Sequence, residues 1–334
     1  MDFKPITKKN VSLEGQDSSQ GLLIVQSANE CIQKAKNQPI PLKLCGNFWF
    51  EGEVCILFAD TNVGKSIFAV QVADNISKGK NKGVFKTETQ PQKVLYFDFE
   101  LSIKQFEKRY SIEWENHYLW DNNFLRVEIN SNYSDFTVFE TQLFAEIEIQ
   151  IIKTQSKILI VDNISFLSME SNESSKSALP LMKYLTKLKN QFKLSLLVLA
   201  HTPKRLNPSN PMTINDLSGS RQIANFADSV FCIGKSSQGA SIRYIKQLKA
   251  RSCAMTDEVW TCELSKPYNF LGFEFISNDY EQKHLKPKKE AEEEMKSIIV
   301  SMKAENPEVS MSKIADELGV HKMKVKRMID KYSL

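Results

Sequence analysis

The sequence lacks any apolar run that approaches the ~20 residues an α-helix needs to cross a bilayer. Its first residues, Met1–Pro5, carry no apolar signal segment. The six cysteines are scattered through the chain without the paired spacing that holds a metal ion. These absences argue against a membrane protein, a secreted disulfide-rich protein and a cysteine-based metal module. We therefore expect a cytoplasmic protein with reduced thiols.

A large excess of charge is also absent. Lys and Arg total 44 against 40 Asp and Glu, which gives a net charge of +4. Such a balance permits a nucleic-acid partner but does not require one. The composition, 42% hydrophobic and 25% charged, is that of a globular protein with a sizeable core. The length of 334 residues allows one large domain and one small domain.

A phosphate-binding loop is the most informative motif present. The apolar run 54–58 is followed by Ala-Asp-Thr-Asn-Val-Gly-Lys-Ser and then by an apolar helical pattern. Glycine at position 64 lets the backbone amides turn toward a phosphate, and the helix N-terminus adds partial positive charge. Lys65 is predicted to contact the β- and γ-phosphates of ATP, and the Ser66 hydroxyl to bind Mg²⁺. The predicted nucleotide-binding residues are Ala59, Asp60, Thr61, Asn62, Val63, Gly64, Lys65, Ser66 and Ile67.

One position of this loop departs from the usual pattern, because Ala59 stands where the first glycine is common. Alanine tolerates a positive φ poorly, so we expect a loop start that accommodates a Cβ atom. A surface turn with a chance Gly-Lys-Ser is the alternative interpretation, and the flanking strand and helix argue against it.

A second metal ligand is predicted at Asp162, which directly follows the predicted strand 157–161 and its apolar run 158–161. In a phosphate-loop protein such an Asp orders the Mg²⁺ shell opposite Ser66. The alternative is an Asp that only caps the end of a strand. Residue 163 is an asparagine, so the general base cannot directly follow Asp162 and must come from elsewhere.

The predicted general base is Glu100, at the end of the strand 94–99. Ligands of parallel sheets bind beside the carboxyl ends of the strands, where this side chain would lie. A helix-capping role is its alternative. Asp98 shares the same strand face but lies deeper, and is the weaker candidate. His201, at the end of the strand 194–200, would contact the γ-phosphate, or else is an ordinary satisfied polar residue.

Strands and helices alternate from residue 45 to about residue 280, which predicts an α/β domain with a mostly parallel central sheet. The last three predicted strands are closely spaced and indicate an antiparallel edge. The predicted strands are 54–58, 94–99, 157–161, 194–200, 229–233, 242–248 and 259–264, and the predicted helices are 65–78, 102–110, 135–152 and 176–192.

The N-terminal part, residues 1–44, is predicted to be a polar tail with a helix. Residues 1–20 are expected to be poorly ordered. Residues 21–37 carry apolar positions at helical spacing. They would form either a short helix on the domain's own core or a linker helix that docks on a neighbouring subunit. The ATPase domain is predicted to span 45–282.

These blocks resemble the RecA-type ATPases, in particular the DnaB and RepA branch of hexameric replicative helicases. The resemblance covers about residues 45–265. Beside the phosphate loop it rests on Tyr96–Glu100, Leu159–Asn163 and Pro211–Val230. It implies a RecA-like core and a homo-oligomer, such as a hexamer, with ATP sites between subunits. The N-terminal primase-binding domain of the larger helicases has no counterpart here.

The resemblance also implies roles for cations outside the phosphate loop. Lys249 and Arg251 resemble the paired basic finger that enters the neighbouring subunit's ATP site and stabilises the transferring phosphoryl group. Their alternative is two solvated charges on an edge strand. Residues 202–222 would form a central-channel loop for single-stranded DNA. Its predicted phosphate contacts are Lys204, Arg205 and Arg221.

The C-terminal part is predicted to be a charged linker, 283–294, followed by a small all-α domain, 295–334. The second and third helices of this domain, with Gly319 in the turn, resemble a helix-turn-helix. Its last helix would bind duplex DNA through basic side chains. A helical interaction module with solvated lysines is the alternative. The predicted contacts are Lys322, Lys324, Lys326 and Arg327.

The sequence thus predicts an ATP- and Mg²⁺-dependent, DNA-associated ATPase with no membrane partner. Its expected role is that of a helicase or helicase-like motor in the replication or mobilisation of a plasmid or mobile element. The alternative is an ATP-switched DNA-binding regulator or recombination mediator without unwinding activity. A clock- or signalling-type RecA ATPase that acts on protein partners is a third interpretation.

Overall fold

The computed structural model describes residues 23–130, 132, 139–163, 178–202, 209–217, 220–318 and 320–332. Residues 1–40 and 41–334 form two separate units. In the first, helix α1 (Ala28–Lys36) begins with a capping box between Ser27 and Glu30, and none of its residues is buried. The predicted disorder of residues 1–20 lies outside the described residues, and both interpretations of residues 21–37 stay predictions.

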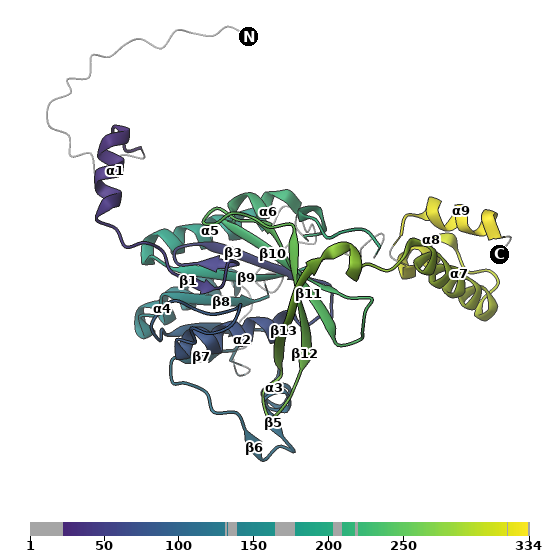
Figure 1. The fold of residues 1–334 in the computed structure, drawn as a ribbon, viewed down its shortest axis with the longest axis horizontal. Coiled ribbons are helices and arrows are strands. Elements are labelled where there is room, and N and C mark those ends of the chain that lie inside the picture. Colours follow the sequence, from purple (N-terminus) through teal and green to yellow (C-terminus); the bar gives the residue numbers. More distant parts are fainter. Residues whose placement is uncertain are drawn as a thin grey trace, which may run out of the picture. The chain divides into compact units, whose positions relative to one another are not determined.

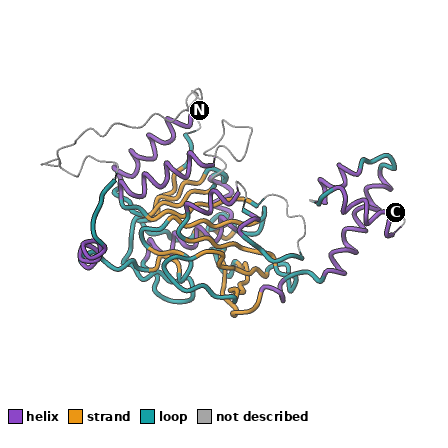
Figure 2. Tube along the Cα trace, turned by 90° about the horizontal axis from the view of Figure 1, so that it is seen from above, coloured by secondary structure: helices purple, strands orange, loops and turns teal. Residues whose placement is uncertain are grey.

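The second unit contains one twisted nine-stranded sheet, shown from two directions in Figures 1 and 2. Its strand order is β13-β12-β11-β10-β3-β9-β8-β4-β7. The strands from β10 to β7 are parallel, and β11, β12 and β13 extend the sheet in antiparallel pairs. The strands are β3 (Val54–Ala59), β4 (Val94–Asp98), β7 (Phe124–Val127), β8 (Ile158–Asp162), β9 (Ser195–His201), β10 (Ser229–Lys235), β11 (Ile242–Lys249), β12 (Glu258–Ser265) and β13 (Gly272–Tyr280).

Both faces of the parallel strands are covered by helices. On β3, Ile56 and Phe58 face the apolar layer of α4, α5 and α6, whereas Cys55 and Leu57 face the layer of α2. A strand buried on both faces reads as a continuous apolar run, which is why these strands were predictable from the sequence. The helices are α2 (Lys65–Lys78), α3 (Ile103–Arg109), α4 (Phe139–Thr154), α5 (Ala178–Phe192) and α6 (Ser220–Phe226).

The predicted fold class is confirmed: the domain is α/β, with a mostly parallel central sheet and an antiparallel edge. Each predicted strand and helix is present. Several elements were not predicted, because they are short or, as in β13, largely exposed. They include β7, β13, α6 and the two small hairpins β1 (Lys43–Cys45) with β2 (Trp49–Phe50) and β5 (Ser111–Ile112) with β6 (Asn116–His117).

Three C-terminal helices, α7 (Lys288–Glu305), α8 (Met311–Leu318) and α9 (Lys322–Tyr332), share an apolar cluster of their own. Ser310 caps α8, because its hydroxyl accepts from the Lys313 backbone N–H at 3.2 Å. The charged segment 283–294 is helical from Lys288 onward. The predicted turn residue Gly319 lies outside the described residues. Over the described chain, no helix is long and apolar enough to span a bilayer.

Candidate nucleotide site

The phosphate loop connects β3 to α2. Gly64 has φ of 109° and forms the N-cap of α2, and Asn62 has φ of 60°, a conformation that asparagine tolerates well. Ala59 is instead the last residue of β3, paired with Ile233 and His201. The loop therefore places its left-handed conformations at Asn62 and Gly64. An alanine is accommodated at position 59 without strain, as the sequence required.

The loop is tied to the neighbouring strand β9. The Thr202 backbone N–H donates to the Ala59 carbonyl at 3.2 Å, and the Thr202 hydroxyl donates to the Asp60 carboxylate. Because β3 and β9 are parallel neighbours, their carboxyl ends meet at one edge of the sheet. This edge also receives the ends of β8 and β4, whose last residues Asp162 and Asp98 pair in register.

Lys65 points along this edge rather than into solvent. Its side chain is buried, and its Nζ lies 3.1 Å from Nδ1 of His201. Burial lowers the pKa of Lys65, and the nearby carboxylates of Asp162 and Glu100 oppose that shift. An ammonium group has only donors, so Nδ1 of His201 must accept from Lys65. On the other side of the ring, Nε2 lies 2.7 Å from the side-chain nitrogen of Asn163.

That other side is occupied by Glu100. His201 Nε2 lies 3.2 Å from Oε1 of Glu100, and the Asn163 side-chain amide donates to the same oxygen. The hydrogen bonds from His201, which has the largest effect, and from Asn163 hold the pKa of Glu100 below its ordinary value. The positive charge of Lys65 acts in the same direction. Lys65, His201 and Glu100 therefore form a continuous chain of contacts. Glu100 is ionised at neutral pH and partly open to water.

Asp162 lies beneath this chain of contacts and is fully buried. The Tyr96 hydroxyl donates to its Oδ2 at 2.8 Å, whereas its Oδ1 has no hydrogen-bond partner among the described residues. Burial raises the pKa of Asp162 to about 6, against the lowering effect of the Ser66 and Tyr96 hydroxyls. The peptide bond from Asp162 to Asn163 is cis.

The donor set at Asp162 fits Mg²⁺. Magnesium takes oxygen ligands, and in nucleotide sites it is held by one or two protein groups together with substrate phosphates. The buried, unbonded Oδ1 of Asp162 and the neighbouring Ser66 hydroxyl supply such oxygens. These are the two residues that the sequence predicted as metal ligands.

Asp98, the weaker candidate for a base, has a different role. Its carboxylate forms an ion pair with Arg126 at 2.9 Å and accepts from the backbone N–H groups of Glu100 and Leu101. The side chain is almost completely buried. Asp98 thus closes the turn that presents Glu100, and its own oxygens are engaged by this structure.

Lys249 and Arg251, the basic pair predicted to act as a finger, lie near the amino ends of the parallel strands, away from the phosphate loop. Lys249 ends β11 and pairs with Val230, near the amino end of β3. Its Nζ donates to the Ala224 carbonyl at 2.8 Å, and Arg251 forms an ion pair with Asp228 at 2.8 Å. One chain therefore does not bring these cations to its own phosphate loop. A role in a neighbour's site stays a prediction.

The predicted DNA contacts are described only in part. Lys204 and Arg205 lie outside the described residues, and the side chain of Arg221 in α6 is also not described. On α9, Lys322, Lys326 and Arg327 are exposed and Lys324 is half-buried. Two further α9 residues pack inward, because Val325 and Met328 belong to the apolar cluster of the three helices.

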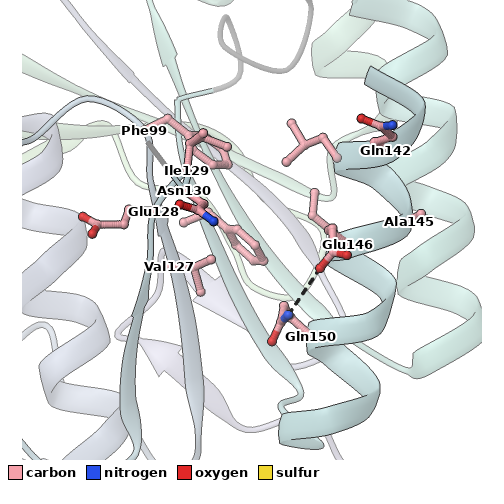
Figure 3. Close-up of a pocket in the computed structure, with 12 residues that line it drawn as sticks. Phe99, Val127, Glu128, Ile129, Asn130, Gln142, Ala145, Glu146 and Gln150 are labelled. Carbon is pink, nitrogen blue, oxygen red and sulfur yellow. Dashed lines mark hydrogen bonds between the residues drawn. The ribbon is translucent and has the colours of Figure 1, made fainter. Parts of the chain in front are cut away.

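A cavity of about 580 Å³ lies elsewhere, between α4 and the ends of β4 and β7 (Figure 3). Its walls are mainly apolar, with Phe99, Val127 and Ile129 facing α4. Glu146 and Gln150 of α4 lie at its polar rim and are hydrogen-bonded to each other. None of the residues predicted for the nucleotide site lines this cavity.

The sequence did not predict that Tyr96 and Asn163 contact the carboxylates of the site. Tyr96 belongs to an apolar strand in the sequence, and because it lies two residues before Asp98 it shares the strand face of that residue. Its hydroxyl can therefore reach the adjacent strand end at Asp162. Asn163 excludes an acid at that position, but its side-chain amide is itself a donor to the Glu100 carboxylate.

The amino-acid sequence of residues 27–206 matches the AAA_25 family, which is described as an AAA domain. A search of curated protein sequences gave no significant match. A solved structure with similarity is that of a KaiC-like protein from the hyperthermophilic archaeon Pyrococcus horikoshii, at 16% identity and a TM-score of 0.45, over 69% of this chain and 91% of that chain. Because the family match spans more than half of the 334 residues and contains the phosphate loop, Glu100 and Asp162, the chain belongs to this AAA domain family of P-loop ATPases.

Proposed function

We propose that this chain is a DNA-associated ATPase, a helicase or helicase-like motor that serves the replication or mobilisation of a plasmid or other mobile element. The observation that carries the hydrolytic part is the chain of contacts from Lys65 through His201 to Glu100 beside the buried carboxylate of Asp162. The DNA-binding part is supported by the exposed cations of α9.

In this proposal each group at the sheet edge has one task. The loop amides and Lys65 bind the phosphates of ATP, so Lys65 exchanges its contact with His201 for a contact with an anion. Ser66 and Asp162 would hold Mg²⁺, which would supply positive charge beside the phosphates. Glu100, ionised and aligned by His201 and Asn163, accepts a proton from the attacking water. His201 links phosphate binding at Lys65 to the base.

A homo-oligomer with ATP sites between subunits is part of the proposal. The position of Lys249 and Arg251, at the edge of the sheet away from their own phosphate loop, supports a role in trans. In a head-to-tail ring each subunit presents one edge to the next. Lys204, Arg205 and Arg221 are proposed to contact single-stranded DNA in the channel of such a ring, and α9 to bind duplex DNA.

The experiment is ATP turnover with and without single-stranded DNA, with the oligomer size measured by light scattering in the same buffer. We expect turnover that DNA stimulates, in an assembly of ring size. Lys65→Ala should abolish turnover while the protein stays folded, and the exposed Lys82→Ala is its matched control. Unchanged turnover in Lys65→Ala would refute the site, and turnover that ignores DNA in a protein that does not bind DNA would favour an ATPase acting on proteins.

A second candidate function is an ATP-switched DNA-binding regulator or recombination mediator without unwinding activity. It is favoured by the separate apolar cluster of α7, α8 and α9, which lets a cationic helix bind duplex DNA without any motor action. Strand displacement on a forked duplex separates the two functions. ATP-dependent displacement supports the motor, whereas ATP-dependent binding without displacement supports the switch.

A further inference from the structure

Arg243 of β11 is a buried cation behind the phosphate loop. Its side chain is 5% exposed, and its Nε–H donates to the Val63 carbonyl at 2.9 Å. Its Nη1 donates to the carbonyls of Ala240 and Ile242 at 2.7 and 2.9 Å. No carboxylate of the described residues lies within ion-pair distance of it. Burial alone lowers the pKa of Arg243, without a contribution from a neighbouring charge.

Such a group is unusual, because buried charges are ordinarily paired. Arginine stays protonated in proteins, so the guanidinium keeps its charge at this position. Three backbone carbonyls accept from three of its five N–H donors but supply no negative charge. Replacing a buried charge by an apolar side chain of similar size is often neutral or stabilising. Fold stability by itself therefore does not account for an arginine here.

The bond to Val63 has a direct consequence for the loop. In a trans peptide the carbonyl of one residue and the N–H of the next point in opposite directions. Holding the Val63 carbonyl toward Arg243 therefore turns the Gly64 N–H away from Arg243, toward the inside of the loop. That N–H is one of the amides that a phosphate-binding loop directs at its ligand.

The adjacent strands pack on the same outer side of the loop. A Cβ atom at Gly64 would lie 2.9 Å from Cζ of Phe273, so the two residues are in tight contact. Gln71 of α2 fixes Phe273 by accepting from its N–H at 2.7 Å and donating to its carbonyl at 3.0 Å. The loop is thus supported from outside by Arg243 and Phe273, both from the antiparallel extension of the sheet.

We propose that Arg243 is a positioning residue of the nucleotide site, which holds the Gly64 N–H in its phosphate-binding orientation. Its charge has no anionic partner until nucleotide phosphates enter the loop. The inference rests on the proposed function, because it requires that the loop binds a nucleotide. It predicts that Arg243 contributes to nucleotide affinity more than to the stability of the nucleotide-free protein.

The test compares Arg243→Met and Arg243→Lys with wild type in the full-length chain. Binding of a fluorescent ATP analogue is measured by anisotropy, and thermal unfolding is measured with and without Mg²⁺ and ATP. We expect Arg243→Met to unfold at the same or a higher temperature without nucleotide, but to bind about tenfold more weakly and to gain less from ATP. Arg243→Lys keeps the positive charge but lacks the planar guanidinium, so its affinity should lie between those of wild type and Arg243→Met.

The matched control is Lys235→Gln, which removes an exposed charge from the residue that pairs with Arg243 on β10. Its affinity should equal that of wild type. A folded Arg243→Met protein with wild-type affinity would overturn the inference, as would a Met variant whose only defect is a lower unfolding temperature. If Arg243→Met does not fold, wild-type affinity in Arg243→Lys would overturn it. Absence of ATP binding by wild type would instead refute the proposed function, and the inference with it.

Discussion

The Tyr96 hydroxyl donates to one oxygen of Asp162, while the other oxygen of this buried carboxylate has no hydrogen-bond partner among the described residues. Only one of the two carboxylate oxygens of Asp162 is therefore hydrogen-bonded within the described residues. Burial then favours the protonated form and raises its pKa from an ordinary value of 3.8 to about 6. A divalent cation at the unbonded oxygen would reverse that preference, because it binds the ionised carboxylate.

The first prediction concerns Asp162→Asn. Since the raised pKa means that the folded state binds the proton more tightly than the unfolded state, stability from this group is present below about pH 4 and lost as pH rises through about 6. Asparagine does not ionise. Without nucleotide or Mg²⁺, Asp162→Asn should therefore be more stable than wild type at pH 8, by on the order of 3 kcal/mol, and nearly equal at pH 4. Thermal unfolding across this pH range measures the difference.

The same variant should lose Mg²⁺-dependent ATP turnover, although it is the more stable protein at pH 8. Tyr96→Phe provides the control, because it removes the hydroxyl but keeps the carboxylate. It should raise the pKa of Asp162 further and move the acid limb of turnover to higher pH. A less stable Asp162→Asn protein at pH 8, or an unmoved acid limb in Tyr96→Phe, would contradict this description of the site.

The second prediction concerns Glu100→Gln. Glutamine still accepts from His201 and Asn163 but cannot take a proton from water, so turnover should fall by at least about 100-fold. Nucleotide affinity should change little. Because the pKa of Glu100 lies below its ordinary value of 4.5, its ionisation should not limit the rate above pH 5. Steady-state turnover and anisotropy with the fluorescent ATP analogue measure the two effects separately.

Glu128→Gln is the matched control for this variant. Glu128 is an exposed acid on the same side of the sheet, paired with Arg126 rather than with the phosphate loop. Its turnover should equal that of wild type. Equal losses in both variants would mean that the charge near this edge matters, and that Glu100 is not the general base.

Much of the site could be predicted because its parts are local in sequence. The loop 59–66 carries its own glycine, lysine and serine, and the strand and helix beside it show the burial pattern directly. Asp162, Glu100 and His201 each follow an apolar run. In a parallel sheet the carboxyl ends of all strands lie on one side, whatever the order of the strands. Residues that directly follow a strand could therefore be assigned to the site without knowing the topology.

The groups that could not be predicted depend on strand order. Arg243 reaches Val63 only because β10 lies between β3 and β11, an arrangement that joins residues 180 positions apart. The pairing of Arg126 with Asp98 likewise requires β7 to lie next to β4. No periodicity in the sequence reports these neighbours. The edge strand β13 was also missed, because its apolar alternation is short, with Phe273 and Phe275 around Glu274, and its second half, from Ser277 to Asp279, is polar.

The third prediction tests α9. A variant with Lys322, Lys326 and Arg327 all changed to Ala removes three exposed cations and leaves the buried Val325 in place. Binding to duplex DNA should weaken, and the slope of log K against log salt should fall by up to about 3. Turnover without DNA should be unchanged. Fluorescence anisotropy with a labelled duplex at several salt concentrations is the measurement.

A control for α9 is Lys289→Ala, which removes an exposed cation from α7. It should leave the salt dependence nearly unchanged if binding is specific to α9. An equal loss would indicate that only the total charge of the chain attracts DNA. An unaltered affinity in the triple variant would mean that the lysines of α9 are simply solvated, and that the three helices bind something other than DNA.

The fourth prediction concerns Arg251, whose guanidinium is paired with Asp228 at the sheet edge away from its own phosphate loop. If Arg251 acts in a neighbour's site, Arg251→Ala and Lys65→Ala should each be inactive alone. In an equal mixture, some interfaces combine an intact loop from the first variant with an intact Arg251 from the second. If the subunits assemble at random, about a quarter of all interfaces are of this kind, so mixing should restore a comparable share of turnover.

Mixing two inactive variants is informative, because turnover does not recover when all residues of an ATP site come from one chain. The control mixture is Lys65→Ala with Glu100→Gln, whose defects both lie at the same phosphate loop and should not complement each other. Recovery in the first mixture and none in the second would place Arg251 in the site of the next subunit. No recovery in either, with oligomers confirmed by light scattering, would leave Arg251 as a structural partner of Asp228, whose pKa it helps to lower.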